Sequence, residues 1–130
     1  MIRIGVVGYG YWGPNLVRNC FEATGAQVAC VSDLRAERLE SVSRRYPTIH
    51  TTQDYRELIV DPSIDAVAIA TPVSTHYDLA LRALQAGKHV LVEKPLASNT
   101  DQVQHLMDLA HDYLTHPATQ DSLDRLCALL

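Results

Sequence analysis

Short hydrophobic runs alternate along the chain with segments in which hydrophobic residues recur every three or four positions. The runs are rich in β-branched residues, which predicts buried strands of a parallel sheet. These predicted strands cover residues 2–7, 27–32, 48–51, 66–70 and 88–92. The helical spacing predicts amphipathic helices from Pro14 to Cys20, over 36–46 and 54–60, between Thr75 and Gly87, and over 100–113. This alternation predicts an α/β fold, a doubly wound parallel sheet with helices on both faces.

Residues with strong positional preferences indicate where several helices begin and end. Pro14 suits the first turn of a helix, and Pro47 ends the helix that precedes it. Thr75 is a candidate N-cap, and Gly87 stands where a C-cap glycine is expected. These signals support the element boundaries that the hydrophobic pattern predicts.

The length of 130 residues suits a single domain with a sizeable core. The pattern breaks near residues 114–117, so we expect one domain over residues 1–113 and a short tail over residues 114–130. Hydrophobic positions in the tail have helical spacing, which predicts a short helix there. These positions are Leu123, Leu126, Cys127 and Leu130.

Composition and charge exclude several classes of protein. The net charge of −4 argues against a nucleic-acid-binding surface, which needs clustered Lys and Arg. No hydrophobic run is long enough to span a membrane, and the first residues do not resemble a signal peptide. The three cysteines are widely separated, with no CxxC pair, so we expect no metal site and reduced thiols. We therefore expect a cytoplasmic protein.

A glycine-rich turn joins the first predicted strand to the first predicted helix. Its sequence is Gly8-Tyr9-Gly10-Tyr11-Trp12-Gly13, the GxGxxG pattern in the strand–turn–helix context of a Rossmann-like dinucleotide site. In such sites the first glycine permits the tight turn, the second admits a pyrophosphate and the third lets helix and strand pack closely. The helix N-terminus adds free N–H groups and a partial positive charge. We therefore expect Gly8, Gly10, Tyr11, Trp12 and Gly13 to bind a dinucleotide.

An acidic residue, Asp33, follows the second predicted strand. A carboxylate there can accept hydrogen bonds from the adenosine ribose and would repel a 2′-phosphate, which favours NAD over NADP. Arg35 argues in the opposite direction, because a guanidinium can bind that phosphate. A structural alternative for Asp33 is an N-cap of the next helix.

Two further groups of polar residues follow the fourth and fifth predicted strands. Ligands of open α/β sheets bind outside the carboxyl ends of the strands, so Thr71, Pro72 and His76 are expected near a nicotinamide. His76 could instead be a surface residue of the first helical turn. Glu93 and Lys94 end the fifth strand at the same edge, where Glu93 could bind ribose hydroxyls and Lys94 could assist proton removal. Their structural alternative is a solvated ion pair.

Taken together, these segments resemble the Gfo/Idh/MocA family of oxidoreductases in order and spacing over residues 1–113. The matching segments are Gly8 to Asn15, Asp33, Ala70-Thr71-Pro72 with His76, Ala86 to Val90, and Glu93-Lys94-Pro95-Leu96. The resemblance implies an N-terminal Rossmann domain that binds NAD, or NADP. It also implies that Lys94 lies at the reacting carbon and that Glu93 faces the nicotinamide ribose.

Members of this family transfer a hydride between the nicotinamide and a hydroxyl carbon of a sugar, nucleotide sugar or polyol. Their substrate domain follows the Rossmann domain and supplies further acid and base groups. We expect that domain to be absent here, so that the chain binds cofactor but is inactive alone. One alternative is a stand-alone dinucleotide-binding or interaction module that self-associates into a homo-oligomer. Another is a site for a different nucleotide, such as a methyl donor, although such a site has no evident need for Lys94.

Overall fold

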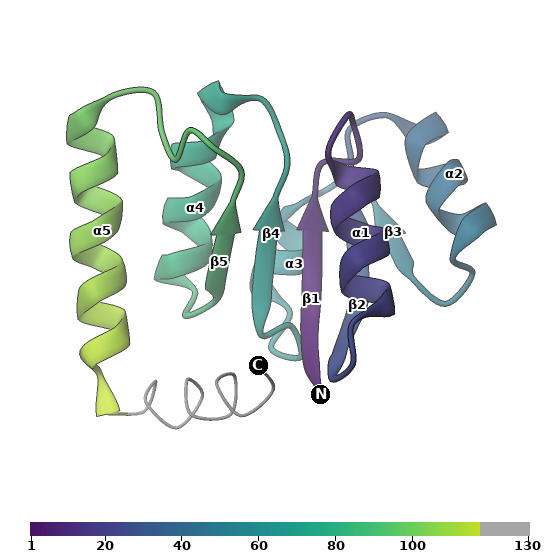
Figure 1. The fold of residues 1–130 in the computed structure, drawn as a ribbon, viewed down its shortest axis with the longest axis horizontal. Helices are drawn as coiled ribbons and strands as arrows, with labels where there is room; N and C mark the ends of the chain where they lie inside the picture. Colours follow the sequence, from purple (N-terminus) through teal and green to yellow (C-terminus); the bar gives the residue numbers. More distant parts are fainter. Residues whose placement is uncertain (118–130) are drawn as a thin grey trace.

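A five-stranded, fully parallel sheet forms the centre of the computed structural model, which describes residues 1–117 (Figure 1). The strand order is β3-β2-β1-β4-β5. The strands are β1 (Ile2–Val7), β2 (Ala26–Ser32), β3 (His50–Thr52), β4 (Ala66–Ile69) and β5 (His89–Val92). The chain winds outward from β1 to β3 and then returns to place β4 on the other side of β1. The reversal between β1 and β4 is the point at which open α/β sheets bind ligands.

Helices cover both faces of the sheet, which confirms the predicted doubly wound arrangement (Figure 1). The α-helices are α1 (Gly13–Glu22), α2 (Ala36–Arg45), α3 (Arg56–Val60), α4 (His76–Gln85) and α5 (Thr100–Thr115), and one 3₁₀ turn is η1 (Val73–Thr75). One hydrophobic core joins α1 and α2 to the sheet, with Val17 and Val42 fully buried. The other joins α3, α4 and α5 to the opposite face, with Leu58 and Ala83 fully or almost fully buried.

Several predicted boundaries are displaced by one or two residues in the structure, among them those of β3, α3 and α5. The third strand is His50–Thr52, not 48–51, because the turn that ends α2 continues to Ile49, whose N–H donates to the carbonyl of Tyr46. Helix α5 continues to Thr115 instead of ending near residue 113. The helix predicted over the last ten residues lies outside the described part of the chain.

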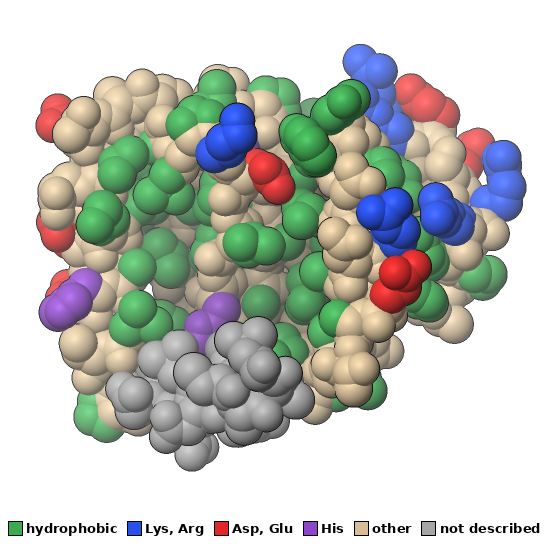
Figure 2. All heavy atoms as spheres, in the orientation of Figure 1, with side chains coloured by type: hydrophobic (Ala, Val, Ile, Leu, Met, Phe, Trp, Pro, Cys, Tyr) green, Lys and Arg blue, Asp and Glu red, His purple; other side chains and the backbone are tan. Residues whose placement is uncertain are grey.

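Hydrophobic side chains also reach the surface in the view of Figure 2, gathered over the sheet between α1 and α5. Leu91, on the edge strand β5, keeps 57% of its surface exposed. Lys and Arg side chains gather mainly toward α1 and α2 in the same view (Figure 2). Within residues 1–117, every helix is too short or too polar to cross a membrane.

The buried thiol of Cys30 in β2 gives a prediction of chemical reactivity. Burial, with smaller contributions from Glu57 and Asp61, raises the pKa of Cys30 to about 12 from an ordinary value of 9.0. Because only the thiolate alkylates, we expect native Cys30 to react with iodoacetamide at pH 8 about a thousandfold more slowly than in the unfolded chain. Peptide mapping by mass spectrometry checks this rate, and equal rates in native and unfolded protein would contradict it.

The same shift makes stability depend on pH. Between about pH 9 and pH 12 the unfolded thiol of Cys30 releases its proton while the folded thiol keeps it. The folded state then binds more protons, so the contribution of this group to the free energy of unfolding falls as pH rises through this window. Cys30→Ala should show a shallower decline over the same range in urea unfolding.

Candidate cofactor site

A cleft of about 730 Å³ lies at the carboxyl ends of β1, β2 and β4. Its volume is in the range of small-molecule and cofactor sites. Residues from the glycine turn, from the end of β2 and from the segment after β4 form its walls. The lining includes Gly8, Gly10, Tyr11, Trp12, Asp33, Arg35, Arg38, Gln53, Tyr55, Thr71, Pro72, Thr75 and Asp78. The structure thus brings together most of the residues that the sequence predicts for a dinucleotide site.

The turn between β1 and α1 requires glycine at two positions for steric reasons. Gly8 has a φ of +97°, and a Cβ atom there would lie 2.6 Å from the carbonyl oxygen of Ala70. A Cβ on Gly13 would lie 2.2 Å from the carbonyl oxygen of Gly8. A Cβ on Gly10 would have Nη1 of Arg38 as its nearest neighbour, at 3.4 Å. Gly8 and Gly13 therefore shape the turn, whereas Gly10 leaves backbone surface open toward the cleft.

Helix α1 begins directly at this turn. Trp12 is its N-cap residue and Pro14 stands in its first turn, as predicted. Tyr11 and Trp12 are 84% and 52% exposed, and their rings make an edge-to-face contact with centroids 5.1 Å apart. The amino end of α1 thus borders the cleft with two exposed aromatic rings, and its partial positive charge favours an anionic ligand.

Asp33 is buried, and its carboxylate is bonded to the glycine turn. Its Oδ2 accepts hydrogen bonds from the backbone N–H of Tyr9 at 2.7 Å and from Nη1 of Arg38 at 3.2 Å. Its Oδ1 accepts from the backbone N–H of Arg35 at 2.9 Å. The carboxylate thereby ties the end of β2 to the turn that follows β1.

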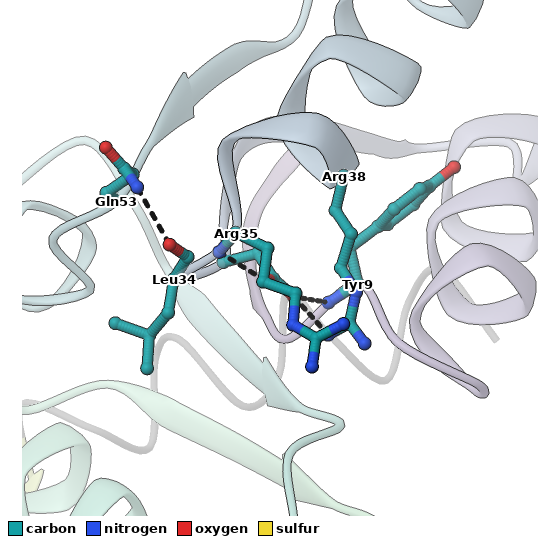
Figure 3. Close-up of polar contacts among 6 residues, drawn as sticks. Tyr9, Leu34, Arg35, Arg38 and Gln53 are labelled. Carbon is teal, nitrogen blue, oxygen red and sulfur yellow. Dashed lines mark hydrogen bonds and ion pairs between the residues drawn. The ribbon is translucent and has the colours of Figure 1, made fainter.

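The N-cap alternative for Asp33 is wrong, because the N-cap residue of α2 is Arg35. Arg38, which no sequence motif singles out, is one of the residues that the structure adds to the site (Figure 3). Its guanidinium pairs with Asp33 and lies beside Gly10. Its distance from Asp33 in the sequence could have indicated this role, because Arg38 follows Asp33 by five residues, in the first turn of the predicted helix. The backbone here is also fixed by Gln53, whose Nε2 donates to the carbonyl of Leu34 at 2.7 Å.

The segment after β4 contributes Thr71 and Pro72 to the cleft wall. Thr71 and Thr75 share a hydrogen bond between their hydroxyls at 2.6 Å, and Thr75 also donates to the carbonyl of Pro72. Thr75 is the N-cap residue of α4, as predicted, although its hydroxyl makes no capping bond. His76 is 2% exposed and belongs to the buried interior, so it is neither a surface residue nor part of the cleft lining.

Glu93 and Lys94 lie just beyond β5, at the same edge of the sheet. The N–H of Glu93 donates to the carbonyl of Ile69 at 3.2 Å, which holds this segment against the end of β4. Glu93 is half-buried and Lys94 is exposed. The ion pairs found among residues 1–117 do not join them, so the solvated Glu93–Lys94 ion pair is absent from the described structure.

The described residues fit a nicotinamide dinucleotide. The glycine turn offers open backbone at Gly10 and a helix amino end for a pyrophosphate. Asp33 follows the end of β2, where the adenosine ribose lies in Rossmann folds, and Arg38 of α2 bonds to it. The segments after β4 and β5 stand on the other side of the turn, at the end expected for the nicotinamide.

Comparisons with known proteins agree with this geometry. Residues 2–114 match the model of the Gfo/Idh/MocA family, described as an oxidoreductase family with an NAD-binding Rossmann fold. The scyllo-inositol 2-dehydrogenase (NAD(+)) of Bacillus subtilis is 37% identical over 102 residues, which are 78% of this chain and 30% of that protein.

Solved structures give the same result. An NAD-binding protein from Listeria innocua superposes with a TM-score of 0.80 at 34% identity, covering 88% of this chain and 34% of the other. Biliverdin reductase from Synechocystis sp. PCC 6803, solved with biliverdin and NADP+, has a TM-score of 0.82 at 31% identity, covering 86% and 35%. The chain spans about a third of the length of these relatives. It belongs to the Gfo/Idh/MocA family of oxidoreductases, and it comprises that family's NAD-binding Rossmann domain.

Proposed function

We propose that this chain is the cofactor-binding part of a dehydrogenase that acts on a hydroxyl carbon of a sugar, nucleotide sugar or polyol. The observation that carries the proposal is the contact between Asp33 and the glycine turn, in a cleft at the reversal of strand order. The family match supports the dinucleotide, and the inositol dehydrogenase among the relatives supports a polyhydroxylated substrate.

The proposal assigns separate roles to the cofactor and to the residues that follow β4 and β5. A bound nicotinamide supplies the group that accepts or returns a hydride. Lys94 holds a substrate hydroxyl and moves its proton, and Glu93 binds hydroxyls of the nicotinamide ribose. Thr71 and Pro72 form the wall beside the nicotinamide. Support for these roles is positional: the backbone of Glu93 is bonded to the end of β4, which places both segments at one edge of the sheet.

We further propose that residues 1–130 alone bind the cofactor without turning over substrate. Hydride transfer needs the substrate held within van der Waals reach of the nicotinamide, in a fixed orientation and away from water. The described residues form one wall of such a site. In the relatives, about two-thirds of the protein lies outside the region matched by this chain.

The proposal is tested by cofactor binding and by the response to a change at Asp33. We expect NADH to bind more tightly than NADPH, because the Asp33 carboxylate accepts ribose hydroxyls and repels a 2′-phosphate. Asp33→Asn keeps an oxygen for the N–H of Tyr9 but removes the charge. It should shift the ratio of the two dissociation constants toward NADPH by about tenfold, with Arg35 and Arg38 available to the phosphate.

Fluorescence titration with both cofactors measures these constants. Asp108→Asn, an equal change of charge on the outer surface of α5, is the matched control and should leave the ratio unchanged. Absence of binding by both NADH and NADPH at millimolar concentration would refute the cofactor-binding proposal. An unchanged ratio in Asp33→Asn would refute the role of the carboxylate alone.

A further inference from the structure

A buried histidine links the segment after β4, which lines the cleft, to the segment after β5. His76 is the first residue of α4 and is 2% exposed. Its Nε2 lies 2.8 Å from the carbonyl oxygen of Thr71, in the segment after β4. Its Nδ1 lies 2.8 Å from the carbonyl oxygen of Pro95, in the segment after β5. The pairing of β4 with β5 ends at Ile69 and Val92, so it does not join these two segments. The imidazole lies between them and contacts both.

The chemistry of this contact is specific to histidine. A carbonyl oxygen only accepts hydrogen bonds, so at least one ring nitrogen of His76 donates, to the carbonyl of Thr71 or to that of Pro95. A planar ring places two polar nitrogens on opposite sides at this separation, which a hydrophobic side chain of equal volume cannot do. Without the imidazole, the carbonyl that accepts its hydrogen bond would lose a partner at a part-buried position.

The contact with Pro95 bears on Lys94. On one side of Lys94, the N–H of Glu93 is bonded to the carbonyl of Ile69 at 3.2 Å. On the other side, the carbonyl oxygen of Pro95 lies against Nδ1 of His76 at 2.8 Å. The backbone of Lys94 is thus fixed to the β4 side of the sheet from both directions, although its side chain is exposed.

We propose that His76 is a positioning residue that holds the segments after β4 and β5 as one wall, and so sets the place of Lys94 and Thr71 beside the nicotinamide. This inference rests on the proposed function, because it concerns the nicotinamide end of that same cleft. It assigns His76 an indirect role, behind the cleft wall, in place of the direct cofactor contact that its position in the sequence suggests.

The first test concerns the protein without ligand. His76→Leu keeps about the same side-chain volume and removes both ring nitrogens. The N–H groups of Glu93 and Ser98 are hydrogen-bonded in the parent, and we expect them to exchange hydrogen at least about tenfold faster in this variant, while the amides of residues 8–13 are unchanged. The control is Ile64→Ala, a destabilising change at a 2% exposed residue before β4, at the opposite end of the sheet. Equal acceleration in both variants, or none in His76→Leu, would overturn the proposal.

The second test separates positioning from a general effect on folding. ADP carries the adenosine and the pyrophosphate but neither the second ribose nor the nicotinamide, so it reports on the glycine turn and Asp33 alone. In His76→Leu we expect NADH to bind about tenfold more weakly and ADP to bind within about twofold of the parent. In Ile64→Ala the two ligands should change together.

These two measurements distinguish failure of the positioning role of His76 from failure of the cofactor-binding proposal. Equal weakening of NADH and ADP binding in His76→Leu, or no change in either, would overturn the positioning role while leaving the cofactor-binding proposal intact. If the parent protein binds neither ligand, the proposed function fails. The exchange experiment then still decides whether His76 holds the two segments together.

Discussion

Gly13→Ala should remove much of the stability of this domain. The new Cβ would lie 2.2 Å from the carbonyl oxygen of Gly8 and 2.9 Å from its carbonyl carbon. Both atoms are backbone, so the clash can be relieved only by moving β1 and α1 apart. Overpacking of a well-packed site costs about 1–3 kcal/mol and more where rigid backbone must shift. We expect a loss of at least about 3 kcal/mol, a large part of the roughly 5–15 kcal/mol typical of a domain.

Urea unfolding followed by circular dichroism measures this loss, as a lower midpoint or as protein that is unfolded without denaturant. The matched control is Gly10→Ala, the same exchange within the same turn, where the nearest neighbour is the flexible end of Arg38. A Gly13→Ala variant with the parent's midpoint would mean that the turn is not packed as described.

Gly10→Ala should instead remove cofactor binding while leaving the fold intact. Its Cβ would be 3.4 Å from Nη1 of Arg38, a contact that a small movement of this half-exposed side chain relieves. The methyl group would, however, occupy the surface through which a pyrophosphate reaches the backbone of the turn. We expect NADH to bind about 10- to 100-fold more weakly, a loss of about 1.4–2.8 kcal/mol. The free energy of unfolding should stay within about 1 kcal/mol of the parent.

Fluorescence titration and urea unfolding on the same preparation separate these two quantities. The prediction is contradicted if Gly10→Ala binds NADH as tightly as the parent, because the pyrophosphate would then not pass over Gly10. It is also contradicted if the variant that loses NADH binding also has a much lower free energy of unfolding than the parent.

The sequence predicts the elements of this fold well because each one carries a strong local signal. The apolar strand before Gly8, the glycine spacing and Pro14 all indicate the same strand–turn–helix unit, and the structure contains it. Boundaries are less well predicted where a turn continues a helix, as at Ile49. Such a turn depends on a single backbone hydrogen bond, which leaves little trace in the pattern of hydrophobic residues.

The main residues of the site are predictable from the sequence, but the contacts between them are not. The place of Asp33 after a strand marks it as a candidate, yet its bond to the N–H of Tyr9 depends on the alignment of β1 with β2. The position of His76 predicts a residue at the cleft, whereas its burial depends on the segment after β5 lying over the start of α4. Contacts of this kind join residues far apart in the sequence, so periodicity and spacing do not reveal them.

The strand order also bears on how the chain folds during synthesis. The central strand β1 is made first, and it pairs with β2 soon afterwards. Its second neighbour, β4, begins only at Ala66, so one edge of β1 stays unpaired until more than half of the described chain has been made. Pairing across such a separation requires closure of a long loop, which slows folding. A nascent chain that has not yet reached β4 therefore exposes an open, apolar strand edge to aggregation and to chaperones.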